Sequence, residues 1–281
     1  MNSDSQLLCF INGEPTDSIS VNDRGLSYGH GLFETIKISN KTAPLLRYHL
    51  ERLIEGARII GINADEALLK KYFYQLLEVM PEDGVIKMIV TAGSSKRGYF
   101  YNKPGSACYI LQWCPLEVNF SLPGKQGVSL RCCQHRLPIS PLLSGIKHLN
   151  RLDQVIARAE WENEFHDGLM LSQDGYVVEC VSSNIFAFKA GVWITPGIAE
   201  CGVAGVMRRY LIDDLFPSVG SIIEEVKLTL DDLLSADEAF ICNSIAGILP
   251  VLSVDGFCSW PRGSHTQKIQ KELYKVFPCY Q

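Results

Sequence analysis

The spacing of hydrophobic and polar residues predicts helices and strands in alternation along the first half of the chain. Apolar residues recur every three or four positions over 48–60 and again over 64–79, so each segment is expected to form a helix with one buried face. Asn63 precedes the second helix, and Pro81 is expected to end it. Strands and helices that alternate in this way are typical of an α/β fold. Strands are expected where turn residues bound apolar runs, at 7–11, 33–38, 84–93 and 107–113.

The second half is predicted to contain short strands and two helices. One helix is expected to begin near Asn150, and the glycine-rich residues 201–205 are expected to lead into the other. An Asp-Gly pair at 174–175 lies between two apolar runs and is a strong hairpin signal, and an Ala-Gly pair at 190–191 marks a second turn. Strands are expected at 127–133, 168–172, 176–180, 184–189, 192–195 and 238–244.

A polar stretch with a Pro-Gly pair is interpreted as a linker at 119–126. It divides the chain into an N-terminal α/β domain, 1–118, and a C-terminal domain, 127–281. A chain of 281 residues is long enough for two domains of ordinary size.

Composition excludes several classes of protein. The formal charge of -5 and the absence of a basic stripe argue against a nucleic-acid partner. No apolar run approaches the roughly 20 residues of a membrane span. The N-terminus lacks the basic start and apolar core of a secretory signal, so a cytoplasmic protein is expected. The ten cysteines form no C-x-x-C pair and lie mostly among apolar residues, so reduced thiols are expected, with no metal site and no disulfide framework.

The segment 144–154, SGIKHLNRLDQ, contains the first candidate for chemistry. Lys147 has His148 and Arg151 as neighbours, and the first acid after it is Asp153. Positive neighbours and partial burial lower the pKa of a lysine and make it a nucleophile of the kind that forms Schiff bases. Most lysines are instead solvated charges, and Lys147 taken alone also fits the exposed start of a helix.

A Schiff-base lysine suggests pyridoxal phosphate, which needs a carboxylate for its pyridine nitrogen and a site for its phosphate. Strand alternation places Glu179 with Val177 and Val181, either at an edge that faces solvent or as a buried charge with a partner. The run CGVAGVMRR, 201–209, offers a tight turn and the amides of a helix start, although such short glycine patterns are usually ordinary turns. Two further candidates for the phosphate are the hydroxyl of Ser244 and the guanidinium of Arg52, which is otherwise a solvated helix residue.

The order of these motifs resembles the fold-type-IV pyridoxal-phosphate enzymes, a family that includes branched-chain and D-amino acid aminotransferases and 4-amino-4-deoxychorismate lyase. The run GIKHLNRLDQV looks most like the lyase members. The resemblance covers most of the chain and rests on DRGLSYGHGLFETIKI, HLERL, GIKHLNRLDQV, DGYVVECVSSNIF, GVAGVMRR and ADEAFICNS.

The resemblance implies a role for each matching residue. Lys147 matches the lysine that binds the cofactor covalently, and Glu179 matches the acid that pairs with the pyridine nitrogen. Val203 matches a residue packed near the cofactor ring. The phosphate site implied by the resemblance consists of Arg52, Ser244 and the amides of Val206 and Met207, where the family often has threonine in place of Met207 and Ser244.

Three further residues match positions near the substrate. Thr35 stands where the lyases carry a threonine and the branched-chain aminotransferases a glycine, and its hydroxyl is expected to transfer a proton. Tyr28 and Arg97 align with substrate-facing loops, and Arg97 is expected to meet a substrate carboxylate. Exposed loop residues fit both of these positions equally well.

The resemblance implies an α/β (α+β) fold of two domains, like that of D-amino acid aminotransferase, with the cofactor in the cleft between the domains and two chains in a homodimer. The implied reaction converts 4-amino-4-deoxychorismate to p-aminobenzoate and pyruvate, a step of folate biosynthesis. Transamination of a D- or branched-chain amino acid on the same fold is the alternative. A non-catalytic small-molecule-binding or thiol-rich regulatory protein on the same scaffold is a further alternative, and the complete set of Lys147, Glu179, Arg52 and Ser244 argues against it.

Overall fold

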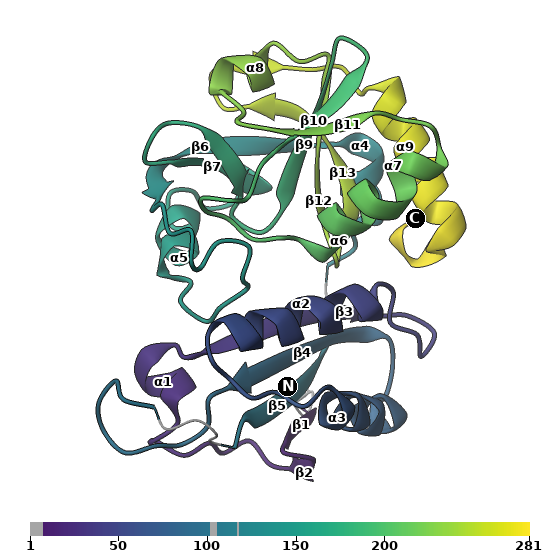
Figure 1. Ribbon diagram of the computed structural model, residues 1–281. Coiled ribbons are helices and arrows are strands. Elements are labelled where there is room, and N and C mark those ends of the chain that lie inside the picture. Colours follow the sequence, from purple (N-terminus) through teal and green to yellow (C-terminus); the bar gives the residue numbers. More distant parts are fainter. Residues whose placement is uncertain (1–7, 102–105, 117) are drawn as a thin grey trace. The chain divides into compact units, whose positions relative to one another are not determined.

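The computed structural model describes residues 8–101, 106–116 and 118–281, and the chain divides into two compact units (Figure 1). Unit 1 contains residues 1–118 and 146–150, and unit 2 contains residues 119–145 and 151–281. Leu7, the first residue of the first predicted strand, lies outside the described residues. The predicted linker belongs to unit 2, where six of its residues form the short helix α4 (Ser121–Gln126).

Unit 1 contains a five-stranded sheet in the order β2-β1-β5-β4-β3 with every pairing antiparallel. The antiparallel pairing differs from the parallel sheet that strand-helix alternation usually accompanies. Two helices lie between β3 and β4 in the sequence. After them the chain enters β4 next to the end of β3, because Gly84 pairs with Ile38. The elements are β1 (Leu8–Ile11), β2 (Glu14–Pro15), α1 (Arg24–Tyr28), β3 (Gly31–Ile38), α2 (Leu46–Ile59), α3 (Glu66–Val79), β4 (Gly84–Thr91) and β5 (Cys108–Pro115).

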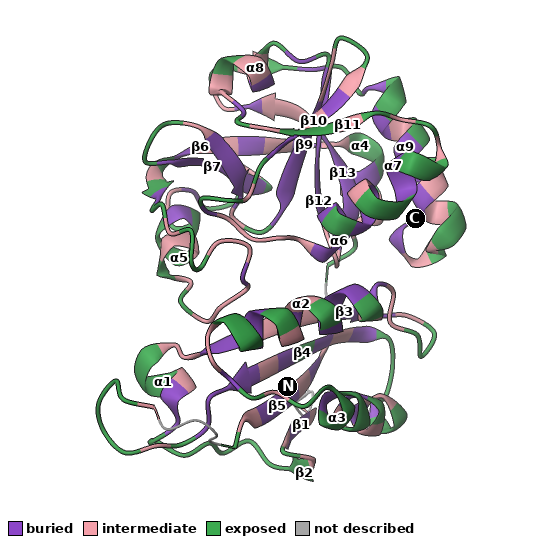
Figure 2. Ribbon diagram, in the orientation of Figure 1, coloured by how far each residue is buried: buried purple, intermediate pink, exposed green. Residues whose placement is uncertain are grey.

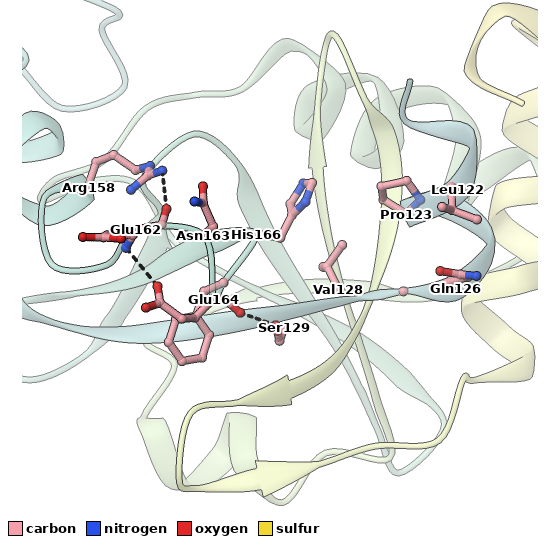
Figure 3. Close-up of a pocket in the computed structure, with 12 residues that line it drawn as sticks. Leu122, Pro123, Gln126, Val128, Ser129, Arg158, Glu162, Asn163, Glu164 and His166 are labelled. Carbon is pink, nitrogen blue, oxygen red and sulfur yellow. Dashed lines mark hydrogen bonds between the residues drawn. The ribbon is translucent and has the colours of Figure 1, made fainter. Parts of the chain in front are cut away.

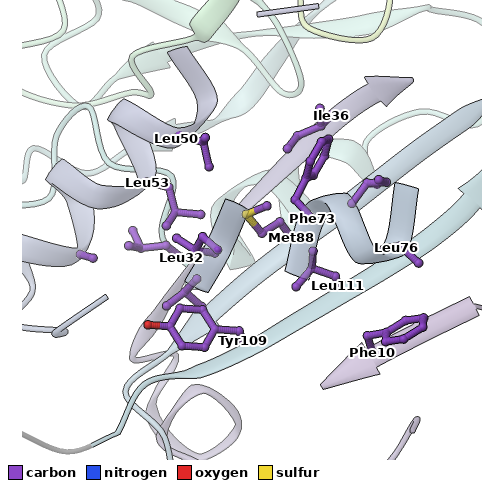
Figure 4. Close-up of a cluster of buried hydrophobic side chains, with 14 of the residues drawn as sticks. Phe10, Leu32, Ile36, Leu50, Leu53, Phe73, Leu76, Met88, Tyr109 and Leu111 are labelled. Atoms are coloured by element: carbon purple, nitrogen blue, oxygen red, sulfur yellow. The ribbon is translucent and has the colours of Figure 1, made fainter. Parts of the chain in front are cut away.

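The two predicted helices of unit 1 form and bury their apolar faces. Asp65, rather than Asn63, caps α3, because its carboxylate accepts from the amides of Ala67 and Leu68. The helix ends before Pro81, as expected. Figure 4 shows the resulting core, which combines side chains of α2, α3 and the sheet: Phe10, Leu32, Ile36, Leu50, Leu53, Phe73, Leu76, Met88, Tyr109 and Leu111.

Unit 2 is built on a mixed sheet in the order β11-β10-β9-β12-β13-β6-β7-β8, with β14 paired to β13. Both predicted hairpins are present, because β7 pairs with β8 and β9 with β10 in antiparallel register. The strands are β6 (Val128–Leu137), β7 (Asp167–Ser172), β8 (Val177–Cys180), β9 (Asn184–Lys189), β10 (Val192–Pro196), β11 (Ile223–Val226), β12 (Glu238–Asn243), β13 (Gly247–Val254) and β14 (Cys258–Ser259).

The helix predicted after the glycine-rich turn runs without a break over residues 206–218. Its middle part, residues 211–215, is a π-helix between two α-helical segments. The remaining helices cover parts of the sheet (Figure 1). The helices of unit 2 besides α4 are α5 (Leu152–Arg158), α6 (Val206–Tyr210), η1 (Leu211–Leu215), α7 (Phe216–Ser218), α8 (Leu230–Leu234), α9 (Ser264–Val276) and the 3₁₀ turn η2 (Pro278–Tyr280).

Helix α5 leaves most of its apolar side chains exposed. Leu152, Val155 and Ile156 are 75%, 61% and 52% exposed, and only Ala157 of this helix is buried (Figure 2). A large apolar side chain that remains in water is informative when several lie on one helix, because together they form a patch that a partner can cover.

All ten cysteines lie in the described part of the chain, and no disulfide joins any of them. Cys133 and Cys201 are two of the buried thiols. Burial raises the pKa of Cys133 to about 12 and that of Cys201 to about 11. Reduced, protonated thiols of this kind behave as small hydrophobic side chains. Among the described residues, no helix is both long enough and apolar enough to span a bilayer.

Candidate active site

Lys147 belongs to a short segment that pairs with β3 of unit 1. The amide of Phe33 donates to the carbonyl of Lys147 at 3.0 Å, and the amide of Leu149 donates to the carbonyl of Gly31 at 3.0 Å. The first acid that follows Lys147 in the sequence, Asp153, pairs with His135 at 2.8 Å. The lysine is therefore held by the backbone of a core strand rather than at the start of a solvated helix.

The lysine side chain lies over one face of β3. Its Nζ is 4.5 Å from the centroid of the Phe33 ring, within the range of a cation–π contact. Thr35 follows Phe33 by two residues, so its side chain is on the same face of the strand. Lys147 Nζ and the Thr35 side chain thus lie on the same face of β3.

The opposite face of β3 carries a charged group that the sequence analysis missed. Glu34 is 1% exposed and accepts hydrogen bonds from His49 Nδ1 at 2.6 Å and from Arg52 Nε at 2.8 Å. Arg52 Nη2 donates to the other Glu34 oxygen at 2.5 Å, which completes a bidentate pair. A signal was present, because alternation places Glu34 with the core residues Leu32 and Ile36, where an acid requires a partner.

These contacts decide the protonation of the buried group. Burial raises the pKa of Glu34, but the charges and hydrogen bonds of Arg52 and His49 outweigh burial and lower it to about 2. Burial lowers the pKa of His49, and the nearby charges of Arg52 and Lys147 lower it further against the opposing effect of Glu34. Glu34 is thus a carboxylate, and it accepts the Nδ1 proton of His49.

Glu179, in β8 of unit 2, is a buried carboxylate rather than an edge residue in solvent. It is 4% exposed, and its Oε2 accepts from the amide of Val203 at 2.8 Å. The expected strand alternation fails here, because the pairing of β7 with β8 shifts register next to Glu179. As a result Val177 and Val181, predicted on one face, pack in two different hydrophobic clusters.

The glycine-rich turn after Cys201 lies directly beside Glu179. Gly202 has φ of +90°, and a Cβ at this position would be 2.8 Å from Val178 and 3.4 Å from Glu179 Oε2. A Cβ on Gly205 would be 1.9 Å from Asn184 Oδ1. Both glycines are required for the turn to approach the strands so closely.

The turn leads into the N-terminus of α6, which begins at Val206. The first-turn amides of an α-helix have no acceptor within the helix, so those of Val206 and Met207 can bind an anion. The side chain of Met207 is fully buried, and only its amide can contribute to such a site. Asn184, which the sequence analysis missed, supports the turn because its Nδ2 donates to the Val203 carbonyl at 3.0 Å.

Ser244 follows β12 in unit 2, in a turn held by the Asn243 side chain. Asn243 Oδ1 accepts from the amides of Ile245 and Ala246 at 2.9 and 2.7 Å. The backbone carbonyl of Ser244 accepts from the Tyr280 hydroxyl at 2.9 Å. The C-terminal residues therefore fix the turn that presents Ser244.

Tyr28 and Arg97 lie in one region of unit 1. The Tyr28 hydroxyl accepts from the amide of Gly98, the residue after Arg97, at 3.0 Å. Arg97 lines a hollow of about 460 Å³ together with Asn22, Ser94, Ser95 and Lys96. A second hollow of about 440 Å³ in unit 2, beside α4, contains none of the predicted site residues (Figure 3).

The structure thus assembles the predicted residues in two groups. Unit 1 carries Lys147, Thr35, Arg52, Tyr28 and Arg97. Unit 2 carries the remaining five: Glu179, Val203, Val206, Met207 and Ser244. Arg52, predicted in the phosphate site, belongs to unit 1 and has one edge of its guanidinium on Glu34.

The donors present fit the cofactor that the resemblance implies. A buried carboxylate suits a protonated pyridine nitrogen, and a helix start whose glycine turn leaves no room for a Cβ suits a phosphate. A lysine held by backbone pairing beside an aromatic ring suits covalent attachment.

The chain was compared with known proteins. Residues 31–254 match the family described as amino-transferase class IV. An aminodeoxychorismate lyase from Vibrio harveyi is 32% identical over 274 residues, which cover 94% of this chain and 98% of that protein. A putative branched-chain-amino-acid aminotransferase from Methanocaldococcus jannaschii is 32% identical over 88% of both chains.

A solved structure is also similar along nearly its whole length. The 4-amino-4-deoxychorismate lyase from Pseudomonas aeruginosa has a TM-score of 0.91 and 41% sequence identity, and the match covers 96% of this chain and 99% of that one. The expected fold is confirmed by this similarity. With a family match over most of its length, this chain belongs to the class IV aminotransferase family.

Proposed function

We propose that this chain is a pyridoxal-phosphate-dependent lyase that converts 4-amino-4-deoxychorismate to p-aminobenzoate and pyruvate, a step of folate biosynthesis. The observation that carries the proposal is the 41% identity to the 4-amino-4-deoxychorismate lyase from Pseudomonas aeruginosa, along 96% of this chain. Thr35 adds support, because it lies on the same face of β3 as the Phe33 ring beneath Lys147.

Each predicted cofactor residue has a role in this proposal. Lys147 would bind the cofactor covalently, and Glu179 would pair with its pyridine nitrogen. The amides of Val206 and Met207, with Ser244 and Arg52, would hold its phosphate. When bound, pyridoxal phosphate withdraws electron density from the carbon that bears the substrate amine.

The chain's own residues then move protons at named atoms. Lys147 Nζ, released when the substrate amine takes its place on the cofactor, would accept the proton from the ring carbon that carries the amine, as a general base. Thr35 Oγ1 delivers a proton to the leaving enolpyruvyl fragment. Loss of that fragment leaves an aromatic ring, which makes the elimination favourable.

The test uses purified protein supplied with pyridoxal phosphate and 4-amino-4-deoxychorismate, without any keto acid. Pyruvate and p-aminobenzoate should form in equal amounts. Lys147→Ala should abolish both products and the covalent retention of the cofactor after borohydride reduction, measured by mass spectrometry. A matched control is Lys87→Ala, which replaces another lysine that contacts the Phe33 ring, at 5.8 Å. Retention of the cofactor in the Lys147 variant would refute the assignment.

The second candidate is transamination of a D- or branched-chain amino acid, which the Methanocaldococcus jannaschii relative favours. It needs the same cofactor residues, so the same assay with a keto acid added separates the two. Product that forms only when an amino acid and a keto acid are both present identifies an aminotransferase.

We also propose that two chains pair through α5. The exposed Leu152, Val155 and Ile156 form an apolar patch that a second copy would cover. Leu152→Glu should shift the mass measured by light scattering from dimer to monomer, whereas Val79→Glu, at a 54% exposed apolar position on α3, should not. A wild-type monomer at micromolar concentration contradicts the pairing.

Ten thiols outside disulfides support a location in the reducing cytoplasm.

A further inference from the structure

A buried arginine, Arg24, binds the loop that carries Arg97. Arg24, the first residue of α1, is 4% exposed. Its Nη1 donates to Ser95 Oγ and to the Gly98 carbonyl, both at 3.0 Å, and its Nη2 donates to the Tyr99 carbonyl at 3.2 Å. These three acceptors lie on both sides of Arg97 in the sequence.

Aromatic rings and an imidazole hold the guanidinium in place. Its Cζ lies 4.8 Å from the centroid of the Tyr28 ring and 5.4 Å from that of Tyr101. Its Nε donates to His30 Nδ1 at 3.1 Å, and His30 Nε2 is 2.9 Å from the Ile60 carbonyl. The orientation of Arg24 is therefore fixed in part by Tyr28 and His30, which lie outside the loop.

The acceptors of Arg24 among the described residues include no carboxylate: they are an imidazole nitrogen, a hydroxyl and two carbonyls. A buried cation that is not paired with a carboxylate keeps a positive potential in its surroundings. Lys96 and Arg97 line the adjacent hollow and add to it. An anion, such as either carboxylate of an enolpyruvyl-substituted ring acid, is the ligand that this potential favours.

We propose that Arg24 is a positioning residue that holds the loop 94–99 so that Arg97 presents its guanidinium to a substrate carboxylate. The proposal rests on the function proposed above, and it adds a residue that does not itself touch the substrate. It predicts that the planar fork of Arg24, and not only its charge, is needed. A lysine keeps the charge but cannot reach three loop acceptors and His30 together.

The experiment compares Arg24→Lys, Arg24→Met and the control Arg58→Met, which replaces an exposed arginine paired with Glu55. KM and kcat are measured with 4-amino-4-deoxychorismate, cofactor affinity by absorbance titration, and hydrogen exchange over 94–99 by mass spectrometry. Both Arg24 variants should raise KM about tenfold, the effect of one misplaced charge-assisted hydrogen bond. Exchange over 94–99 should rise, while cofactor affinity and the control stay at wild-type values.

Two outcomes overturn the proposal. A wild-type KM in Arg24→Lys would show that charge alone suffices, and unchanged loop exchange would show that Arg24 does not hold the loop. If Arg24→Met fails to fold, Ser95→Ala, which removes one acceptor, must still increase exchange over 94–99 and raise KM. Failure of the proposed function is distinguishable, because wild-type protein would then bind cofactor but release no pyruvate. In that case the KM for an amino-acid substrate, measured in the transamination assay, would test the role of Arg24.

Discussion

Replacing Glu34 by Gln tests whether a buried ion pair organises unit 1. The substitution keeps the size of the side chain and removes the charge that Arg52 and His49 share. The pKa of Glu34 is about 2 in the folded protein, against an ordinary value of 4.5. At about 1.4 kcal/mol for each pH unit, this difference corresponds to about 3 kcal/mol of unfolding free energy at neutral pH. Removal of one partner from a buried pair usually costs a similar amount, about 3–5 kcal/mol.

The direction of the pH dependence follows from the lowered pKa. A carboxyl whose folded pKa is below its unfolded value contributes its full stability above the unfolded value, here 4.5. That contribution is lost as the pH falls from 4.5 toward 2. The difference in stability between wild type and Glu34→Gln should therefore be largest at neutral pH and shrink across this acidic range.

The assay is urea-induced unfolding of the cofactor-free protein, since a bound cofactor would itself stabilise the folded state. Glu55→Gln, which breaks an exposed pair with Arg58, is the control and should leave the unfolding midpoint unchanged. An unfolding free energy for Glu34→Gln equal to that of the control would refute the reasoning. So would a deficit that persists undiminished at pH 2.

Two further substitutions test the packing. Gly202→Ala should lower the melting temperature more than Gly175→Ala, because both have positive φ but only the first places a Cβ within 2.8 Å of Val178; equal losses in scanning calorimetry would mean that the close approach is relaxed at no cost. Phe73→Ala, at a 1% exposed position in the core of unit 1, should lower the unfolding free energy by about 3–5 kcal/mol in urea titrations. Tyr74, on the same helix, is 51% exposed, so Tyr74→Ala should change the unfolding free energy little. Similar losses in the Phe73 and Tyr74 variants would show that α3 does not pack as described.

Local signals in the sequence were sufficient for most elements, and they made Lys147 a candidate. Helical spacing located α2 and α3, and an Asp-Gly turn located the β7–β8 hairpin, because these patterns depend on residues close together in the chain. The sequence alone does not reveal short elements such as α1, α4 and β11, which have too few residues for a period to emerge.

The candidate site shows the same division between local and distant contacts. Motif order in the sequence determined which residues to consider, from Lys147 to Ser244. The partners of Glu34 and Arg52, the register shift beside Glu179 and the clamp by Arg24 depend on residues that are distant in the chain. Only the tertiary structure decides them, because a buried charge or a shifted strand is stable only when the groups that compensate it arrive from elsewhere in the fold.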